Sequence, residues 1–284
     1  MPELPEVETV RIGLEKYLVG DVFKTVQVLR EQSVGYPSVT KFTKGLARKE
    51  VISVERRGKY LLIHLDSKAG LGVHLRMSGR LIVADKKHKP AEFLRINIKL
   101  ESGRDLRFED MRVFGRMWYV PPGETFEDII PALTLLGPEP LGKDLTAKYL
   151  LEAVKGRKQA IKTALLDQTL IAGLGNIYAD EVLFQTGIHP LSSAGTMTKP
   201  DAEKLVVAIK KTLKQAIELG GSSLKDYTDS QGVNGKYQHS AWVYGRAKQP
   251  CRVCGEPIER IKLVGRSAHF CSNCQTKMRG RPTK

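Results

Sequence analysis

The stretch that says most about the fold is Cys251–Cys274, CRVCGEPIERIKLVGRSAHFCSNC. It reads C-x2-C, sixteen residues, C-x2-C, and it holds all four cysteines of the 284-residue chain. Two cysteines with two residues between them can bind one metal ion from a single tight turn, called a knuckle. A second knuckle completes a tetrahedral shell of four thiolates. The spacing therefore predicts one structural Zn²⁺, bound by Cys251, Cys254, Cys271 and Cys274.

A zinc in such a closed shell has no open coordination position, so it folds the segment and does no chemistry. Disulfides are the alternative, and a reducing cytosol disfavours them. Arg260, Lys262 and Arg266 lie between the knuckles, where a two-stranded finger would display them. Basic side chains on a finger most often meet phosphate; a merely solvated basic face is the weaker alternative.

The basic charge of the finger extends to the whole chain. Lys and Arg number 46 against 31 acidic residues, a formal charge of +15 with a sequence pI near 9.6. Residues 241–284 hold ten Lys or Arg and two Glu, which is +8 of that total. A generically basic protein is the alternative, but this surplus favours nucleic acid as the partner.

Composition bounds the class of protein. Hydrophobic residues make up 41% of the chain, which indicates a globular protein. No apolar run approaches the roughly 18 residues of a membrane-spanning helix, and the charged start does not read as a signal peptide. We expect a cytoplasmic protein without a membrane partner.

Upstream of the finger the pattern falls into two blocks. Residues 20–120 alternate at strand spacing and predict an antiparallel sheet structure, whose cleanest hairpin runs over residues 94–108 with a turn at Ser102-Gly103. A Pro- and Gly-rich boundary at residues 121–142 precedes helical patterns. A Gly-, Ser- and Asn-rich stretch at 220–235 reads as a mobile loop.

The first residues pose a separate question. Pro5 suits a first helical turn, and the apolar residues that follow recur at helical spacing. The acids Glu6 and Glu8 complement the positive N-terminal end of the helix dipole. Helix formation accounts for the residues from Pro5 onward, but it gives no reason for Pro2 and Glu3.

Several stretches, spread over nearly the whole chain, occur in the same order as the motifs of one known family. They are PELPEVETVR (2–11), RRGKYL (56–61), HLRMSGR (74–80), DMRVFG (110–115), LGPEPL (136–141), LLDQTLIAGLGNIYADEVLF (165–184), GGSS (220–223) and GRSAHFCSNCQ (265–275). Together they resemble the bacterial formamidopyrimidine-DNA glycosylases. The resemblance implies an enzyme that excises oxidised purines (8-oxoguanine and formamidopyrimidines) from damaged double-stranded DNA and then cuts the strand by β,δ-elimination.

The resemblance also implies an α+β multidomain fold. We expect an N-terminal β-sandwich-like catalytic domain over residues 1–130, beginning with the catalytic helix. A helix–two-turns–helix domain would follow over residues 131–240, with residues 220–235 as the lesion-recognition loop. The zinc finger would occupy residues 241–284, with DNA between the domains and the protein acting as a monomer.

Four residues match the family's catalytic positions. Removal of Met1 would expose Pro2 as a secondary amine, which attacks C1′ of the damaged nucleotide and forms an iminium. Glu3 would be the general acid and base beside it. Lys59 matches the lysine that approaches the sugar-phosphate, and Arg266 matches the finger arginine of the elimination steps. No catalytic cofactor is expected.

Other matched residues would contact DNA. His74, Lys158 and Lys162 match phosphate-contact positions. Asn176 can cap a helix, and it can also bind phosphate at that helix start, where Gly173 and Gly175 leave room. The side chains expected to fill the gap left by a rotated-out nucleotide are Met77, Arg112 and Phe114.

Two positions depart from the family pattern. Phe93 stands where the family often has a His, with His88 five residues earlier, and Ser78 replaces a Glu of some lesion pockets. The nearest alternative is endonuclease VIII, which prefers oxidised pyrimidines; Leu4 favours the purine branch. The other alternative is a non-catalytic zinc-finger DNA-binding protein, and the presence of Pro2, Glu3 and Lys59 argues against it.

Overall fold

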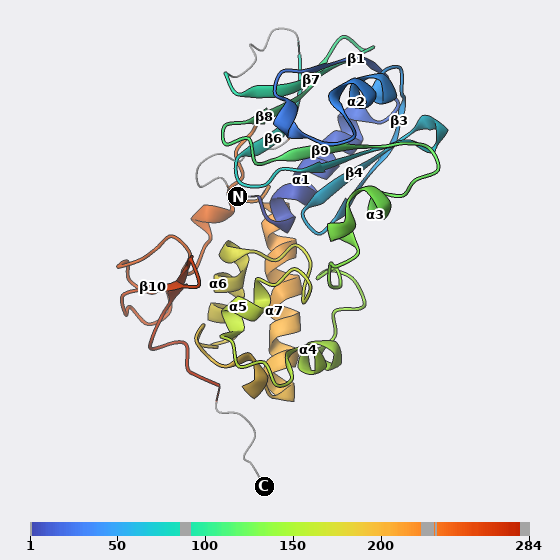
Figure 1. Ribbon diagram of the computed structural model, residues 1–284. Helices are drawn as coiled ribbons and strands as arrows, with labels where there is room; N and C mark the ends of the chain where they lie inside the picture. Colours follow the sequence, from blue (N-terminus) through green and yellow to red (C-terminus); the bar gives the residue numbers. More distant parts are fainter. Residues whose placement is uncertain (1, 86–91, 223–229, 231, 279–284) are drawn as a thin grey trace. The chain divides into compact units, whose positions relative to one another are not determined.

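A computed structural model of the 284-residue chain describes residues 2–85, 92–222, 230 and 232–278 (Figure 1). The chain forms two compact units. The first comprises Met1–Leu135 and Leu219–Lys236, and the second comprises Leu136–Glu218 and Tyr237–Lys284. Within the described residues, no helix is long and apolar enough to cross a membrane.

The first unit contains two sheets. The four-stranded sheet has the order β1-β7-β8-β6, and its strands are Phe23–Val28, Leu94–Leu100, Asp105–Asp110 and Gly79–Ala84. The five-stranded sheet has the order β2-β9-β5-β4-β3, and its strands are Val34–Tyr36, Arg116–Val120, Gly70–His74, Tyr60–Leu65 and Val51–Arg57. Every pairing is antiparallel except β2 with β9. The β-sandwich-like fold is confirmed.

The predicted hairpin is present as β7 and β8. Its register pairs Ile98 with Leu106 and Ile96 with Phe108, all buried, so the alternation of the sequence places one apolar face in the core. Gly103 has φ +87 in the connecting turn, a left-handed conformation that glycine adopts without strain.

Helix α1, Leu4–Leu18, brings the N-terminus into this core. Its apolar stripe (Val7, Val10, Leu14 and Leu18) is fully buried, as its spacing predicts. The helix packs against β3 and β4 of one sheet and β6 of the other. Because both sheets contact α1, the residues at its start are held in a fixed place.

The sheet prediction omits helix α2, Val39–Leu46. Phe42 and Leu46 bury one side of it, and Gly45 lies so close to the Tyr119 ring of β9 that an added Cβ would clash at 2.4 Å. The remaining short helices of this unit are η1 (Glu31–Ser33), η2 (Asp66–Lys68), α3 (Phe126–Ile129) and η3 (Pro131–Leu133).

The described residues between Leu219 and Lys236 belong to the first unit, although the sequence groups them with the helical domain. Contacts at its described residues give the reason: a Cβ on Gly221 would meet the Glu6 carboxyl group of α1 at 2.9 Å, and the Val83 N–H of β6 donates to the Ser230 carbonyl at 2.9 Å. The three predicted domain boundaries otherwise stay a prediction. The centre of the predicted loop, residues 223–229 and 231, lies outside the described residues.

The second unit is helical and ends in a finger. Its helices are α4 (Ala147–Val154), α5 (Ile161–Leu165), α6 (Asn176–Gln185), η4 (Ala194–Thr196), α7 (Lys199–Glu218) and η5 (Tyr237–His239). The helical patterns that the sequence shows after residue 142 are therefore present as helices. Helix α7 packs along α4 and α6.

The finger consists of β10, Glu259–Leu263, paired with β11, Arg266–Phe270. Val264 and Gly265, at φ +46 and +73, make the tight turn between them. Its small core joins Cys251, Ile258 and Cys271 to Phe184 and Val243. With so few apolar side chains, the segment needs the metal to fold.

Candidate functional site

The start of α1 is buried and hydrogen-bonded. Pro2 is buried, and Glu3 and Glu6 are 2% and 1% exposed. The Glu3 N–H donates to Glu6 Oε2 (2.8 Å), and the Ser222 N–H donates to Glu6 Oε1 (2.7 Å). One carboxylate therefore holds the helix start to the segment that begins the predicted lesion loop.

Lys59 and His74 lie near each other at one end of the five-stranded sheet. Lys59 is 8% exposed in the tight turn between β3 and β4, where Gly58 has φ +56. His74 ends β5, its ring lies 4.5 Å from that of Tyr60, and its Nδ1 accepts the Arg76 N–H at 3.0 Å. Burial first, then the charges of Arg76 and Lys59, lower the His74 pKa to about 3. His74 is therefore neutral near pH 7, and Nε2 is left as its donor.

The three predicted gap-filling residues occupy two turns of the first unit. Met77 and Phe114 are 38% and 48% exposed, and the Arg112 guanidinium lies 4.8 Å from the centre of the Phe114 ring. Left-handed backbone flanks them, at Arg76 (φ +53) and Val113 (φ +56). For a β-branched residue such as Val113 this conformation is strained, and such strain collects at functional sites.

A buried carboxylate ties these two turns together. Asp110 is fully buried; its Oδ1 accepts the Ser78 hydroxyl (2.6 Å) and the Arg112 N–H (3.2 Å), and its Oδ2 accepts the Gly115 N–H (2.7 Å). Ser78, 3% exposed, thus links the Met77 turn to the Arg112 turn. This contact gives Ser78 a structural role in place of the lesion-pocket Glu.

The start of α6 follows a shaped turn in the second unit. Gly175 is the N-cap, so Asn176 is the first helical residue and does not cap the helix, contrary to the capping interpretation. Its buried Oδ1 has no hydrogen-bond partner among the described residues. Gln168 holds the turn: its Oε1 accepts the Gly173 N–H (2.9 Å) and its Nε2 donates to the Leu174 carbonyl (2.8 Å).

The two predicted phosphate lysines differ in their surroundings. Lys158 is exposed. Lys162 is fully buried, and its ammonium forms an ion pair with Asp180 Oδ1 at 2.6 Å and donates to the Ser267 carbonyl of β11. Lys162 therefore holds α6 to the finger inside the second unit, and its phosphate contact stays a prediction.

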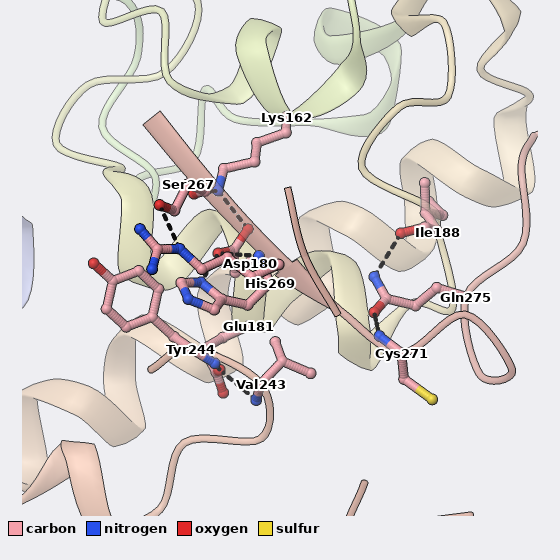
Figure 2. A network of polar contacts seen from close by, with 11 residues as sticks. Lys162, Asp180, Glu181, Ile188, Val243, Tyr244, Ser267, His269, Cys271 and Gln275 are labelled. Atoms are coloured by element: carbon pink, nitrogen blue, oxygen red, sulfur yellow. Dashed lines mark hydrogen bonds and ion pairs between the residues drawn. The ribbon is translucent and has the colours of Figure 1, made fainter. Parts of the chain in front are cut away.

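Figure 2 shows how α6 holds the finger through neighbouring acids. Asp180 Oδ2 accepts the backbone N–H of His269 (3.0 Å) and lies 3.1 Å from His269 Nδ1. Glu181, fully buried, accepts three successive backbone N–H groups, those of Trp242, Val243 and Tyr244. Burial raises the Glu181 pKa, and those three donors oppose the shift.

The four cysteines come together as the spacing predicts. Their sulfur atoms all lie within 4.8 Å of one another, with 3.5 Å between Cys254 and Cys271 and 3.9 Å between Cys251 and Cys274. Zinc–thiolate bonds of about 2.3 Å at tetrahedral angles put sulfur atoms ~3.8 Å apart. The cluster fits one structural Zn²⁺. The Gln275 side chain supports it by bridging the Cys271 N–H and the Ile188 carbonyl (Figure 2).

Arg260, Lys262 and Arg266 are all exposed on the hairpin, as the sequence predicts. Phe93 departs from the family pattern. The Arg80 guanidinium carbon lies over its ring, 5.8 Å from the ring centre. His88 lies outside the described residues. Sequence reasoning missed the roles of Glu6, Asp110, Gln168, Asp180 and Glu181.

Comparison with known protein families finds three matching domains, in the order that the sequence predicts. The "Formamidopyrimidine-DNA glycosylase N-terminal domain" matches residues 1–117, the "H2TH domain" of the same enzymes matches residues 136–228, and the "Zinc finger found in FPG and IleRS" matches residues 248–277. Among curated proteins, a formamidopyrimidine-DNA glycosylase of Gloeobacter violaceus is 50% identical over 277 residues, 97% of this chain and 98% of that protein. One from a Synechococcus is 47% identical, over 97% and 99%.

Solved structures agree. A Lactococcus lactis enzyme of this type, a mutant in complex with Fapy-dG-containing DNA, has a TM-score of 0.90 and 36% identity, over 97% of this chain and all of that one. A complex of the Lactococcus lactis protein with DNA containing an abasic site has a TM-score of 0.89 at the same identity and coverage.

The ion pair behind the finger generates a prediction. Asp180→Ala leaves the Lys162 ammonium buried without its counter-charge, and we expect it to destabilise the second unit by about 3–5 kcal/mol. Combining Asp180→Leu with Lys162→Met removes both charges, and we expect it to recover part of that loss; the rest remains because the His269 N–H loses its acceptor. The measurement is urea unfolding followed by Trp242 fluorescence in a Trp118→Phe background. A loss below about 1 kcal/mol for Asp180→Ala, the size of an exposed pair, would contradict the assignment.

Proposed function

The chain belongs to the formamidopyrimidine-DNA glycosylase family, and on that premise we propose that it is a bifunctional base-excision-repair enzyme. It removes oxidised purines from duplex DNA and then acts as an abasic-site lyase. The observation that carries the proposal is the start of α1, where Pro2 and the buried Glu3 lie at the positively polarised end of a helix.

Pro2 is the nucleophile of this proposal. Once Met1 is removed, its nitrogen is a secondary amine, and the positive end of α1 disfavours a second positive charge on it. The amine attacks C1′, a C–N bond forms, and the bond to the damaged base breaks. The C1′–O4′ bond then breaks, which opens the sugar ring and leaves O4′ as a hydroxyl after it takes up a proton from Glu3. Because the amine is secondary, the product is a permanently charged iminium, which acts as an electron sink.

The iminium makes strand cleavage possible. It acidifies the 2′ hydrogen, so loss of that proton expels the 3′ phosphate by β-elimination. A second elimination, δ, expels the 5′ phosphate. Glu3 moves the protons of sugar and base, and its burial keeps bulk water from competing for them.

Lys59 and Arg266 assist these steps. Lys59, held in the β3–β4 turn, supplies positive charge to the sugar-phosphate as negative charge develops. Arg266, at the first residue of β11, binds phosphate from the finger. Arginine suits this role because its planar fork donates two parallel hydrogen bonds to a phosphate.

The remaining DNA contacts follow from the site. The N–H groups at the start of α6, with the Asn176 side chain, form a phosphate site of the helix-terminus type. Lys158 adds an exposed charge. Neutral His74 contributes a hydrogen bond from Nε2 and no charge.

The gap that opens when the damaged nucleotide is rotated out of the DNA duplex is filled by Met77, Arg112 and Phe114. The two apolar side chains fill space, and the Arg112 guanidinium pairs with the orphaned base. Asp110 and Ser78 keep both turns in one position, so the three side chains enter the duplex together.

The bound Zn²⁺ supplies folding free energy to the finger, and its four thiolates leave no open position for a reactant. We further propose that the enzyme acts as a monomer in the cytoplasm. Leu4 remains the residue that favours oxidised purines over the oxidised pyrimidines of endonuclease VIII.

Incubation with an 8-oxoguanine-containing duplex tests the proposal. We expect base release and strand cleavage with phosphate at both ends of the gap, and Glu3→Gln is the matched variant that binds the duplex without comparable release. Faster action on a duplex with an oxidised pyrimidine would favour the endonuclease VIII alternative. Binding without cleavage on either duplex would favour the non-catalytic alternative.

A second prediction concerns Arg112. Unstacking a base costs a few kcal/mol, and one guanidinium paired to a base edge contributes roughly 1–3 kcal/mol. Arg112→Ala is therefore expected to slow base excision by about one to two orders of magnitude, since each tenfold is about 1.36 kcal/mol. Elimination at a preformed abasic site in a single strand is expected to be nearly unchanged, because no orphaned base is present.

Single-turnover kinetics on the two substrates measure this difference. Met111→Ala is the control, an exposed side chain on the same turn (57% exposed) without an assigned role. Equal losses on both substrates in Arg112→Ala would assign Arg112 to the elimination steps or to folding, and would remove the gap-filling role.

A further inference from the structure

A groove in the second unit lies outside the site described above. It has a volume of about 1310 Å³ and is lined by the C-terminal end of α6, the last turns of α7 and the first zinc knuckle. A smaller hollow of about 520 Å³ continues it along α7, since the two share Gln185, Thr186 and Lys211. We call the two together the α7 groove.

The α7 groove combines exposed apolar side chains with unpaired positive charge. Val207 and Val253 line it and are 67% and 66% exposed, and the Trp242 ring stacks on Phe184 at 5.7 Å. Its basic residues are Lys204, Lys211, Lys214 and Arg252, against the acids Glu203 and Glu218. Within the described part of the chain, none of the three lysines forms an ion pair.

The groove is separate from the proposed phosphate site. That site is at the N-terminal end of α6, at Asn176, whereas the groove is at the other end, at Gln185. A helix of ten residues is roughly 15 Å long. The finger contributes its knuckle residues Arg252 and Val253 to the groove, while Arg266 is on the hairpin.

We propose that the α7 groove docks an acidic segment of another protein that carries apolar side chains. The unpaired lysines and Arg252 match carboxylates, and the exposed valines with the Trp242 ring match apolar anchors between them. A nucleic acid backbone offers the charge and lacks the apolar groups, so it leaves Val207 and Val253 uncovered. Docking here would recruit the enzyme while its DNA-binding side chains stay free.

The test uses the full-length, zinc-loaded protein and a fluorescein-labelled twelve-residue peptide of Asp and Glu with two Leu. Anisotropy is expected to show binding that a peptide with both Leu replaced by Ser largely loses. Lys211→Glu with Lys214→Glu, both exposed on α7, is expected to weaken binding about tenfold, since each exposed charge contributes up to ~1 kcal/mol. Val207→Asp is expected to weaken it comparably.

Lys148→Glu, an exposed lysine on α4 outside the groove, is the control and is expected to leave peptide binding unchanged. Excision from damaged duplex is measured on every variant and is expected to match the wild type, so this proposal can fail while the proposed function stands. Equal affinity for the Leu and Ser peptides, or binding unchanged in the α7 variants, would overturn it. A parallel loss of duplex affinity in Lys211→Glu with Lys214→Glu would make the groove a nucleic acid surface and overturn it too.

Discussion

The Glu6 carboxylate is the contact on which the candidate active site depends most. One of its oxygens accepts the Glu3 N–H and the other accepts the Ser222 N–H, a residue 216 positions away. The first contact fixes the start of α1, and therefore the place of Pro2 and Glu3. The second fixes where the chain enters the 219–236 segment. Gly221 is needed there, because at φ +77 any Cβ would meet the Glu6 carboxyl group.

A buried carboxylate that accepts backbone N–H groups recurs at two further places, the Arg112 turn and the segment before the finger. Asp110 binds N–H groups on both sides of the Arg112 turn, and Glu181 binds three successive N–H groups before the finger. A buried carboxylate is costly unless it is hydrogen-bonded, and backbone N–H groups satisfy it with fixed geometry. Loops held in this way can carry exposed residues such as Arg112 and Phe114 without losing their position.

The sequence predicted what depends on local pattern. Spacing was enough for the zinc cluster, the buried stripe of α1 and the β7–β8 hairpin, because ligand geometry and side-chain periodicity act over a few residues. The burial of Lys162 in an ion pair was not predicted, since its partner Asp180 is eighteen residues away and the finger sets that burial. Helix α2 was missed because Val39–Leu46 lies among strand patterns and is determined by packing on β9. The roles of Glu6 and Asp110 could not be predicted, because their N–H donors are brought to them only when the chain folds.

The proposed chemistry depends on the amine at the start of α1. The most direct measurement is borohydride reduction of the enzyme with an 8-oxoguanine duplex, followed by mass spectrometry of the peptide joined to the sugar. We expect one cross-linked peptide, attached through the Pro2 nitrogen, and almost none from protein that retains Met1 or is blocked at Pro2. Attachment through a lysine such as Lys59, or undiminished trapping by the blocked protein, would contradict it.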